Sequence, residues 1–116
     1  MSNALIIGWN KAVPGREAQA QELFQSSLAY WGKQVKEGNI ESFEPCIFQS
    51  HGGDMNGFIY IKGAPQKLDA IQHTDDYINL VMQAGLYLEG SGFIRGYQGQ
   101  RLMDMMQRWG KLIPKS

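Results

Sequence analysis

The hydrophobic periodicity of this chain changes in a fixed order, and that order limits the folds the chain can adopt. Apolar runs typical of strands alternate with runs whose apolar residues have helical spacing. The elements therefore follow one another as strand, helix, strand, strand, helix, strand, with one more helix at the end. With right-handed crossovers, a βαββαβ order gives a four-stranded antiparallel sheet with both helices on one face. The sequence therefore predicts an α+β domain.

The element boundaries follow from changes of period and from residues that stop an element. Strands are expected at residues 4–10, 40–50, 58–62 and 86–97, and helices at residues 17–36, 68–85 and 100–112. The resulting unit is a ferredoxin-like fold followed by an extra helix. We expect one domain over residues 1–116, with a ferredoxin-like core at 4–99 and an amphipathic C-terminal helix at 100–113.

Four local signals refine this assignment. Pro45 removes a backbone donor, so its strand is expected at a sheet edge or at a bulge. A compact turn is expected at residues 51–57, where Asn56 and Gly57 both accept positive φ, which favours a hairpin. Thr74 resembles a helix N-cap, so the second helix is expected as two abutting pieces or with a bend at residues 72–74. The glycines at 90 and 92 predict one strand with a sharp bulge, and two short strands joined by a turn are the alternative.

Composition excludes several classes of partner. Eleven basic residues balance eleven acidic ones and are interspersed with them, so neither nucleic acid nor an anionic membrane is an expected partner. No apolar run approaches the roughly 20 residues that a spanning helix needs, and the amino end lacks the pattern of a signal peptide. The single cysteine, Cys46, fits a reducing compartment and is expected as a buried, inert thiol. We therefore expect a cytoplasmic protein.

The predicted sheet has one face that a single copy leaves uncovered. Both faces of the first and third strands are apolar, and soluble monomers avoid bare apolar patches of several hundred Å². A symmetric homodimer in which two such faces meet is the expected solution. The alternative is that the C-terminal helix covers the face of its own chain, and the sequence leaves open on which copy that helix packs.

The chain resembles the dimeric α+β barrel superfamily, which includes antibiotic-biosynthesis-type monooxygenases and EthD-like proteins. The resemblance lies in the first strand, the turn at residues 13–17, the hairpin and the helix restart at residues 74–77, and it covers about residues 4–99. It implies a homodimer whose two sheets form a barrel, with pockets between sheet and helices. It is a resemblance of pattern and brings no catalytic motif with it.

Haem degradation is excluded by comparison with similar enzymes of this superfamily. Those enzymes use an asparagine, a tryptophan and a histidine, and only Asn10 matches, because Lys62 and Val81 stand near the other two positions. The two histidines are far apart in sequence and no metal-ligand spacing is present. We expect no cofactor and no metal.

Four polar residues remain as weak catalytic candidates: Asn10, Tyr60, His73 and Arg95. Each can donate a hydrogen bond to a developing anion. The simpler interpretation of Arg95 is a salt bridge, with Glu44 or Glu89 as the expected partner, or solvent exposure. The favoured function is a homodimer that binds a hydrophobic or aromatic small molecule. The alternatives are a cofactor-independent monooxygenase or isomerase acting on an aromatic or polyketide-like substrate, and a structural or regulatory interaction protein that docks through the apolar stripe of residues 102–113.

Overall fold

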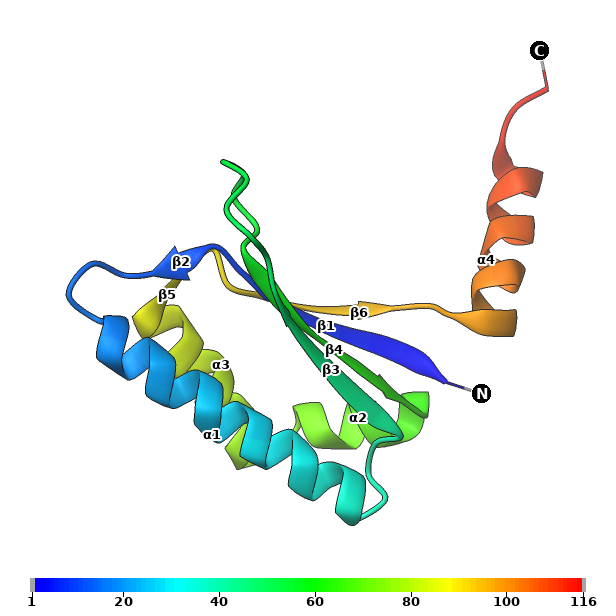
Figure 1. The fold of residues 1–116 in the computed structure, drawn as a ribbon. Helices are drawn as coiled ribbons and strands as arrows, with labels where there is room; N and C mark the ends of the chain where they lie inside the picture. The colour runs from blue at the N-terminus through cyan, green and yellow to red at the C-terminus, as the bar shows by residue number, and fades with distance from the viewer. Residues whose placement is uncertain (1, 116) are drawn as a thin grey trace.

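The computed structural model describes residues 2–115 and shows a four-stranded antiparallel sheet with three helices on one of its faces (Figure 1). The strand order is β3-β4-β1-β6. In chain order the elements are β1 (Asn3–Trp9), β2 (Lys11–Ala12), α1 (Glu17–Lys36), β3 (Ser42–Ile47), β4 (Gly57–Gly63), α2 (Pro65–Gln72), α3 (Asp75–Tyr87), β5 (Leu88–Glu89), β6 (Gly92–Gly96) and α4 (Gly99–Leu112). The α+β, ferredoxin-like fold is thereby confirmed.

Side-chain alternation along the strands separates two faces of the sheet. Leu5 of β1 lies opposite Ile61 of β4 and Arg95 of β6, and this row faces the helices. The next row, one residue along, pairs Ile6 with Tyr60 and Ile94 and faces away from them. Leu5 and Ile61 are fully buried, whereas Ile94 is 63% exposed. The core therefore lies between sheet and helices, and the second face has no cover within the chain.

Helix α1 supplies the largest buried side chain. Trp31 has no exposed surface and meets Tyr30 and Tyr77 edge-on, with ring centroids 4.8 Å and 6.5 Å away. The helix begins at Glu17, whose carboxylate accepts a hydrogen bond of 3.0 Å from the backbone N–H of Gly15. That bond lowers the pKa of Glu17. It also places a negative charge at the positive end of the helix dipole.

Of the two alternatives for the second helical segment, two abutting pieces are what the structure shows. Helix α2 ends at Gln72 and α3 begins at Asp75, with Thr74 between them as the N-cap. The Thr74 hydroxyl oxygen accepts a hydrogen bond of 3.3 Å from the backbone N–H of Tyr77. This cap satisfies one of the free donors at the start of α3 and lets the chain change direction there.

Two turns differ from the prediction. The β3–β4 connection does pass through the predicted turn at residues 51–57, but the positive φ falls on Gly52 instead of Asn56 or Gly57, and Gly57 is already part of β4, opposite Ile47. Residues 86–97 are not one bulged strand. They comprise the end of α3, the short strand β5, a turn with Gly90 at positive φ, and β6. The alternative of two strands joined by a turn is the correct one, because β5 leaves the main sheet to pair with β2.

Strand β3 confirms one prediction and corrects another. Pro45 does lie in an edge strand, where a residue without a backbone N–H is tolerated. Cys46, expected as buried, is exposed. Cys46 pairs with Phe58 of β4. Alternation along the strands places both side chains on the uncovered face of the sheet.

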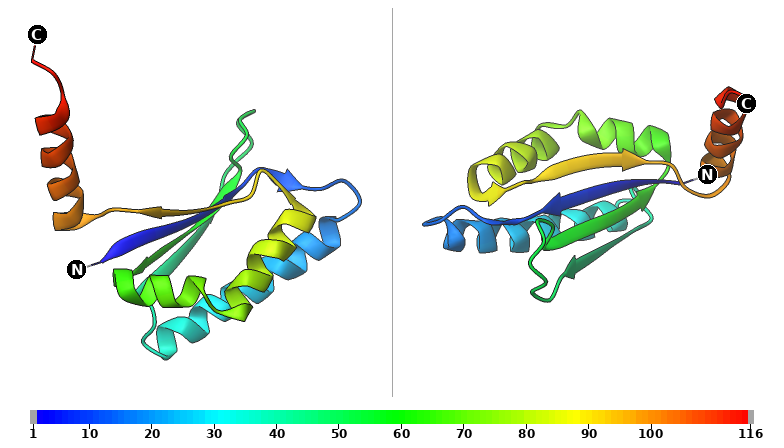
Figure 2. Two further views of the ribbon diagram at one scale, coloured as in Figure 1. Left: turned by 180° about the vertical axis from the view of Figure 1, so that it is seen from behind. Right: turned by 90° about the horizontal axis from the view of Figure 1, so that it is seen from above.

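Helix α4 stands apart from the rest of the molecule. Figures 1 and 2 show it projecting from the end of β6 on the side of the sheet away from the other three helices. It does not cover the free sheet face of its own chain, so the alternative of an intramolecular cover is not what the structure shows. No helix within residues 2–115 combines the length and the apolar character needed to cross a membrane.

Candidate functional site

A cavity of about 210 Å³ lies between the helix-facing side of the sheet and helices α1 and α3. The strands contribute Ile7, Trp9, Ile59 and Phe93 to its wall, all from rows that alternation turns toward the helices. Most of the wall is therefore apolar. A cavity of this kind favours an apolar molecule over water, since water needs several polar partners.

The cavity exists because small side chains face one another across it. Ala20 and Ser27 of α1 and Ala84 of α3 line it from the helix side. Each lies on the cavity side of its helix, where a larger side chain would occupy part of the cavity volume. Small side chains on both helices leave space between them and the sheet. The ordered sheet holds the surrounding backbone in place, so this space stays open.

Trp9 forms one end of the cavity and depends on a missing side chain. A Cβ atom on Gly57, its partner on β4, would lie 2.5 Å from Cζ2 of the indole, so the ring lies where a side chain would otherwise be. Phe24 meets the same ring edge-on, with centroids 5.8 Å apart. Gly57 thus fixes the orientation of the largest aromatic group in the wall.

A short two-stranded ladder closes one side of the cavity. Strands β2 and β5 contribute Ala12 and Leu88 to the wall. The ladder is extended by backbone hydrogen bonds of 2.9 Å from Asn10 N–H to the Glu89 carbonyl and from Val13 N–H to the Tyr87 carbonyl. An exposed ion pair between Lys11 Nζ and Glu89 Oε2, 3.9 Å apart, lies on the same ladder and contributes little stability.

The polar chemistry of the cavity is limited. Ser27 can donate and accept a hydrogen bond, and Lys11 can offer a positive charge at the rim. In the part of the chain that the structure describes, no group of three His, Cys, Asp or Glu side chains is arranged to hold a metal ion. The geometry suits binding of an apolar molecule with one hydrogen bond.

The four candidates predicted from the sequence do not share one site. Asn10 lies just beyond β1, where its Oδ1 accepts a 2.6 Å hydrogen bond from the amide of Asn56. The hydroxyl of Tyr60 lies on the uncovered sheet face and accepts a hydrogen bond from the amide of Gln98. None of the four lines the cavity. Their catalytic role stays a prediction without a common geometry to support it.

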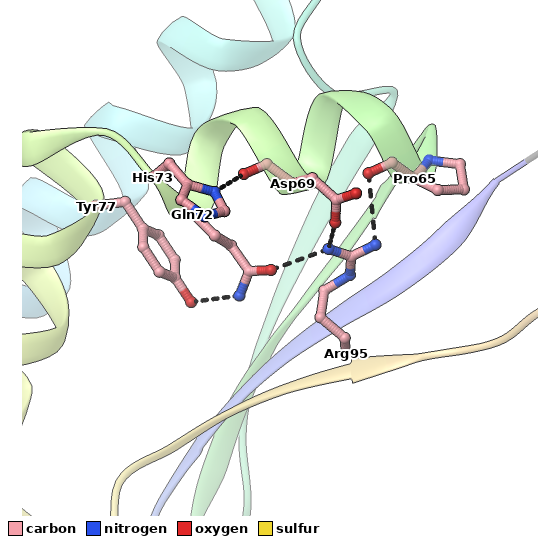
Figure 3. Close-up of polar contacts among 6 residues, drawn as sticks. All are labelled: Pro65, Asp69, Gln72, His73, Tyr77 and Arg95. Carbon is pink, nitrogen blue, oxygen red and sulfur yellow. Dashed lines mark hydrogen bonds and ion pairs between the residues drawn. The ribbon is translucent and has the colours of Figure 1, made fainter.

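Arg95 and His73 are brought together through Asp69 (Figure 3). Arg95 Nη1 donates to Asp69 Oδ1 at 2.6 Å and to Gln72 Oε1 at 2.9 Å, while His73 Nδ1 lies 2.7 Å from the Asp69 carbonyl oxygen. Gln72 in turn donates to the Tyr77 hydroxyl at 3.0 Å. This polar network ties β6 to helix α2. Each of its contacts is explained by a structural role alone.

The salt bridge expected of Arg95 exists, but its partner is neither Glu44 nor Glu89. Arg95 is in the row of Leu5, which faces α2, so Asp69 is the acid within reach. Glu44 is in the row of Tyr60 on the opposite face. Glu89 lies on the β2–β5 ladder beside Lys11.

Tyr77 gives a prediction at alkaline pH. Burial raises its pKa above the ordinary value of 10.0, partly offset by the hydrogen bond from Gln72. The folded protein therefore holds this proton to a higher pH than the unfolded chain does. The contribution of Tyr77 to the free energy of unfolding is fully present below pH 10. It decreases as the pH rises further. Urea unfolding curves between pH 9 and 11 should show the decrease, and Tyr77→Phe should make it shallower. An unchanged slope in the variant would contradict the assignment.

The residues that form the cavity were identified from the sequence only as core. Ala20, Leu23 and Phe24 lie on the apolar side of the helix predicted over residues 17–36, whereas neither Ala84 nor the β2–β5 ladder was predicted. The signal that could have indicated a cavity is the recurrence of small residues, at 20, 27 and 84, inside stripes that otherwise carry large ones.

Comparison with known proteins supports the fold and no more. No protein-family model and no curated protein matches the sequence. A dimeric protein of unknown function and ferredoxin-like fold from Bacteroides fragilis is similar in structure, with a TM-score of 0.61 at 9% identity, over 84% of this chain and 96% of the other. An ethyl tert-butyl ether D (EthD) family protein from Bacillus halodurans gives a TM-score of 0.60 at 12% identity, over 85% of this chain and 100% of the other. The chain thus shares the ferredoxin-like fold for which the Bacteroides fragilis protein is described, and its overall structure is also similar to that of the EthD family protein.

Proposed function

We propose that this chain forms a homodimer and that each protomer binds a small hydrophobic or aromatic molecule in the cavity between the sheet and helices α1 and α3. The cavity is the observation that carries the binding proposal. At about 210 Å³ it is larger than the engineered apolar cavity of about 150 Å³ that takes up benzene. Trp9, Phe24 and Phe93 offer ring edges and faces to a bound aromatic group.

The uncovered sheet face supports the homodimer. Ile6, Phe58 and Tyr60 lie on this face beside Ile94, whose side chain is largely exposed. Apolar area of this kind is stabilised when a second copy covers it. The structurally similar protein from Bacteroides fragilis is described as dimeric.

We also propose a cytoplasmic location, because a chain with one exposed free cysteine suits a reducing compartment.

Binding ranks ahead of catalysis for a chemical reason. A cofactor-independent oxygenase or isomerase must stabilise an anion or move a proton at the bound molecule. Among the side chains that line the cavity, only Ser27 and Lys11 are polar. Lys11 is paired with the exposed carboxylate of Glu89, 3.9 Å away on the β2–β5 ladder, and among the described residues no base accepts a hydrogen bond from the Ser27 hydroxyl.

A cavity-filling variant tests the binding proposal. Ala20→Leu places three more carbons in the cavity from α1, and we expect it to weaken binding of toluene, phenol or 1-naphthol by at least about tenfold while raising stability by about 0.5–2 kcal/mol. Ala29→Leu is the matched control, because Ala29 is on the same helix but exposed. Thermal shift with each probe and NMR of the isoleucine methyl groups provide the measurements.

The wild-type protein should gain about 2.7 kcal/mol of stability at a probe concentration of 100 times Kd. Methyl resonances of Ile7 and Ile59 should move, because both side chains line the cavity. If all probes shift Ala20→Leu as much as the wild type, they bind elsewhere. If no probe stabilises the wild type at millimolar concentration, the binding proposal is wrong and the homodimer proposal is unaffected.

A further inference from the structure

Helix α4 carries the most one-sided apolar surface of the chain and leaves it in solvent. None of its residues is buried, and it makes no extended packing with another element of residues 2–115. Polar side chains occupy the rest of its circumference. Met105 is half-buried. The other large apolar side chains of the helix are exposed by 43% or more, namely Leu102, Met103, Met106, Trp109 and Leu112. A helix of this length in water depends on packing of such a stripe for its stability.

The chain as a whole exposes more surface than a compact monomer of its mass. A folded monomer of 13.1 kDa has about 6,400 Å² of accessible surface, whereas this chain has 7781 Å². The radius of gyration is 16.3 Å, compared with about 13 Å for a compact chain of this length. The excess of about 1,400 Å² exceeds the roughly 800 Å² that each partner contributes to a standard stable interface.

Charge is divided between the helix and the rest of the chain. Residues 99–115 contain Arg101, Arg108, Lys111 and Lys115 against the single acid Asp104, which gives a net charge of +3. Residues 1–98 contain seven basic and ten acidic side chains, a net charge of −3. The α4 segment is therefore attracted to the body of such a chain, and the structure keeps it away from its own.

The direction of α4 points to a second copy as the body that receives it. In Figure 1 the helix rises from the sheet on the uncovered side, and the β3–β4 connection rises on that side at the opposite end. Fourteen residues of helix extend about 21 Å, and two sheets that pack face to face lie about 10 Å apart. A partner sheet seated on the uncovered face therefore lies beside α4, and the helix reaches past that sheet.

We propose that α4 is an exchanged arm: in the homodimer, the apolar stripe of each α4 packs against the flank of the other protomer. This inference rests on the homodimer of the proposed function and adds a second contact to the meeting of the two sheets. The stripe of residues 102–112 is covered only when the partner is present. The positive charge of each arm then lies against the negative body of the partner.

Site-specific photocross-linking in the full chain tests the exchange. Met106→p-benzoylphenylalanine places the probe in the stripe, and Gln107→p-benzoylphenylalanine places it on the polar side of the same turn as a control. Irradiating a mixture of ¹⁴N- and ¹⁵N-labelled protein and analysing peptides by mass spectrometry separates links between copies from links within one. We expect Met106 to yield inter-chain links, at twice the 13.1 kDa mass, several-fold more often than Gln107.

Sedimentation equilibrium gives an independent measurement. The combined variant Leu102→Gln, Met106→Gln, Trp109→Gln should raise the dimer dissociation constant by at least about 100-fold, because central apolar and aromatic anchors dominate interface energies. Gln107→Ala should leave the dissociation constant unchanged. A wild-type monomer at micromolar concentration would remove the homodimer itself. A wild-type dimer with only intra-chain links from Met106, with equal links from both positions, or with no effect of the combined variant would overturn the exchange and leave the homodimer standing.

Discussion

Replacing Trp31 with alanine is expected to lower the free energy of unfolding by about 3–5 kcal/mol, the usual cost of truncating a buried aromatic residue. Trp31 has no exposed surface and joins α1 to α3 through its edge-on contact with Tyr77. The neighbouring Leu5, Ile61 and Leu68 belong to the same core cluster and are held by the sheet and α2, so they cannot collapse into the space. Most of the removed volume stays as a cavity.

Urea unfolding followed by circular dichroism measures this loss. Trp31→Phe is the matched control, since it keeps a ring in the core and removes an indole N–H that is buried without a hydrogen-bond partner in the described structure. We expect the phenylalanine variant to lose less than half as much stability as the alanine variant. A loss below about 1 kcal/mol for alanine would show that this region repacks freely, contrary to a core of ordinary density.

Replacing Ile94 with glutamate is expected to turn the proposed homodimer into a monomer. Ile94 lies on the uncovered sheet face in the row of Ile6 and Tyr60, which ends at Glu44 on the edge strand. In a two-fold symmetric interface each substitution occurs once in each protomer. An unpaired charge buried in an apolar interface makes the free energy of association less favourable by several kcal/mol. We expect the dissociation constant to rise by at least about 100-fold.

Light scattering coupled to gel filtration reports the mass, and urea unfolding reports the fold. Because Ile94 is 63% exposed in the single chain, the folded protomer itself should change by no more than about 0.5 kcal/mol. Met82→Glu on the outer side of α3 is the control, with a similar exposure of 65%. A dimer that survives Ile94→Glu but dissociates in Met82→Glu would place the interface on the helices instead of the sheet.

The sequence allowed the fold to be predicted because its long elements have strong periods. The twenty residues of α1, the split at Thr74 and the edge position of Pro45 each follow from local chemistry that the tertiary structure does not oppose. The errors concern short or shared elements. A two-residue strand such as β5 has no period of its own and forms only because β2 is beside it, so residues 86–97 read as one strand.

The candidate site was much less accessible from the sequence. A polar residue attracts notice by its type, and Arg95 is such a residue, yet its partner Asp69 was missed because sequence does not say on which face of β6 it lies. The cavity depends on something less visible, the absence of volume at Ala20, Ser27 and Ala84 on two helices that meet only in three dimensions. Hydrophobic stripes with small residues look the same whether they pack tightly or leave space.

The β2–β5 ladder bears on the motion that any bound molecule would require. It is the shortest sheet in the protein, is held by few backbone hydrogen bonds and lies over the cavity, whereas the other walls belong to long helices and the four-stranded sheet. Small peripheral units of this kind open at a lower free energy than the whole domain unfolds. We therefore expect residues 11–12 and 88–89 to open more readily than the rest of the cavity wall, and the residence time of a bound molecule would follow the rate of this opening.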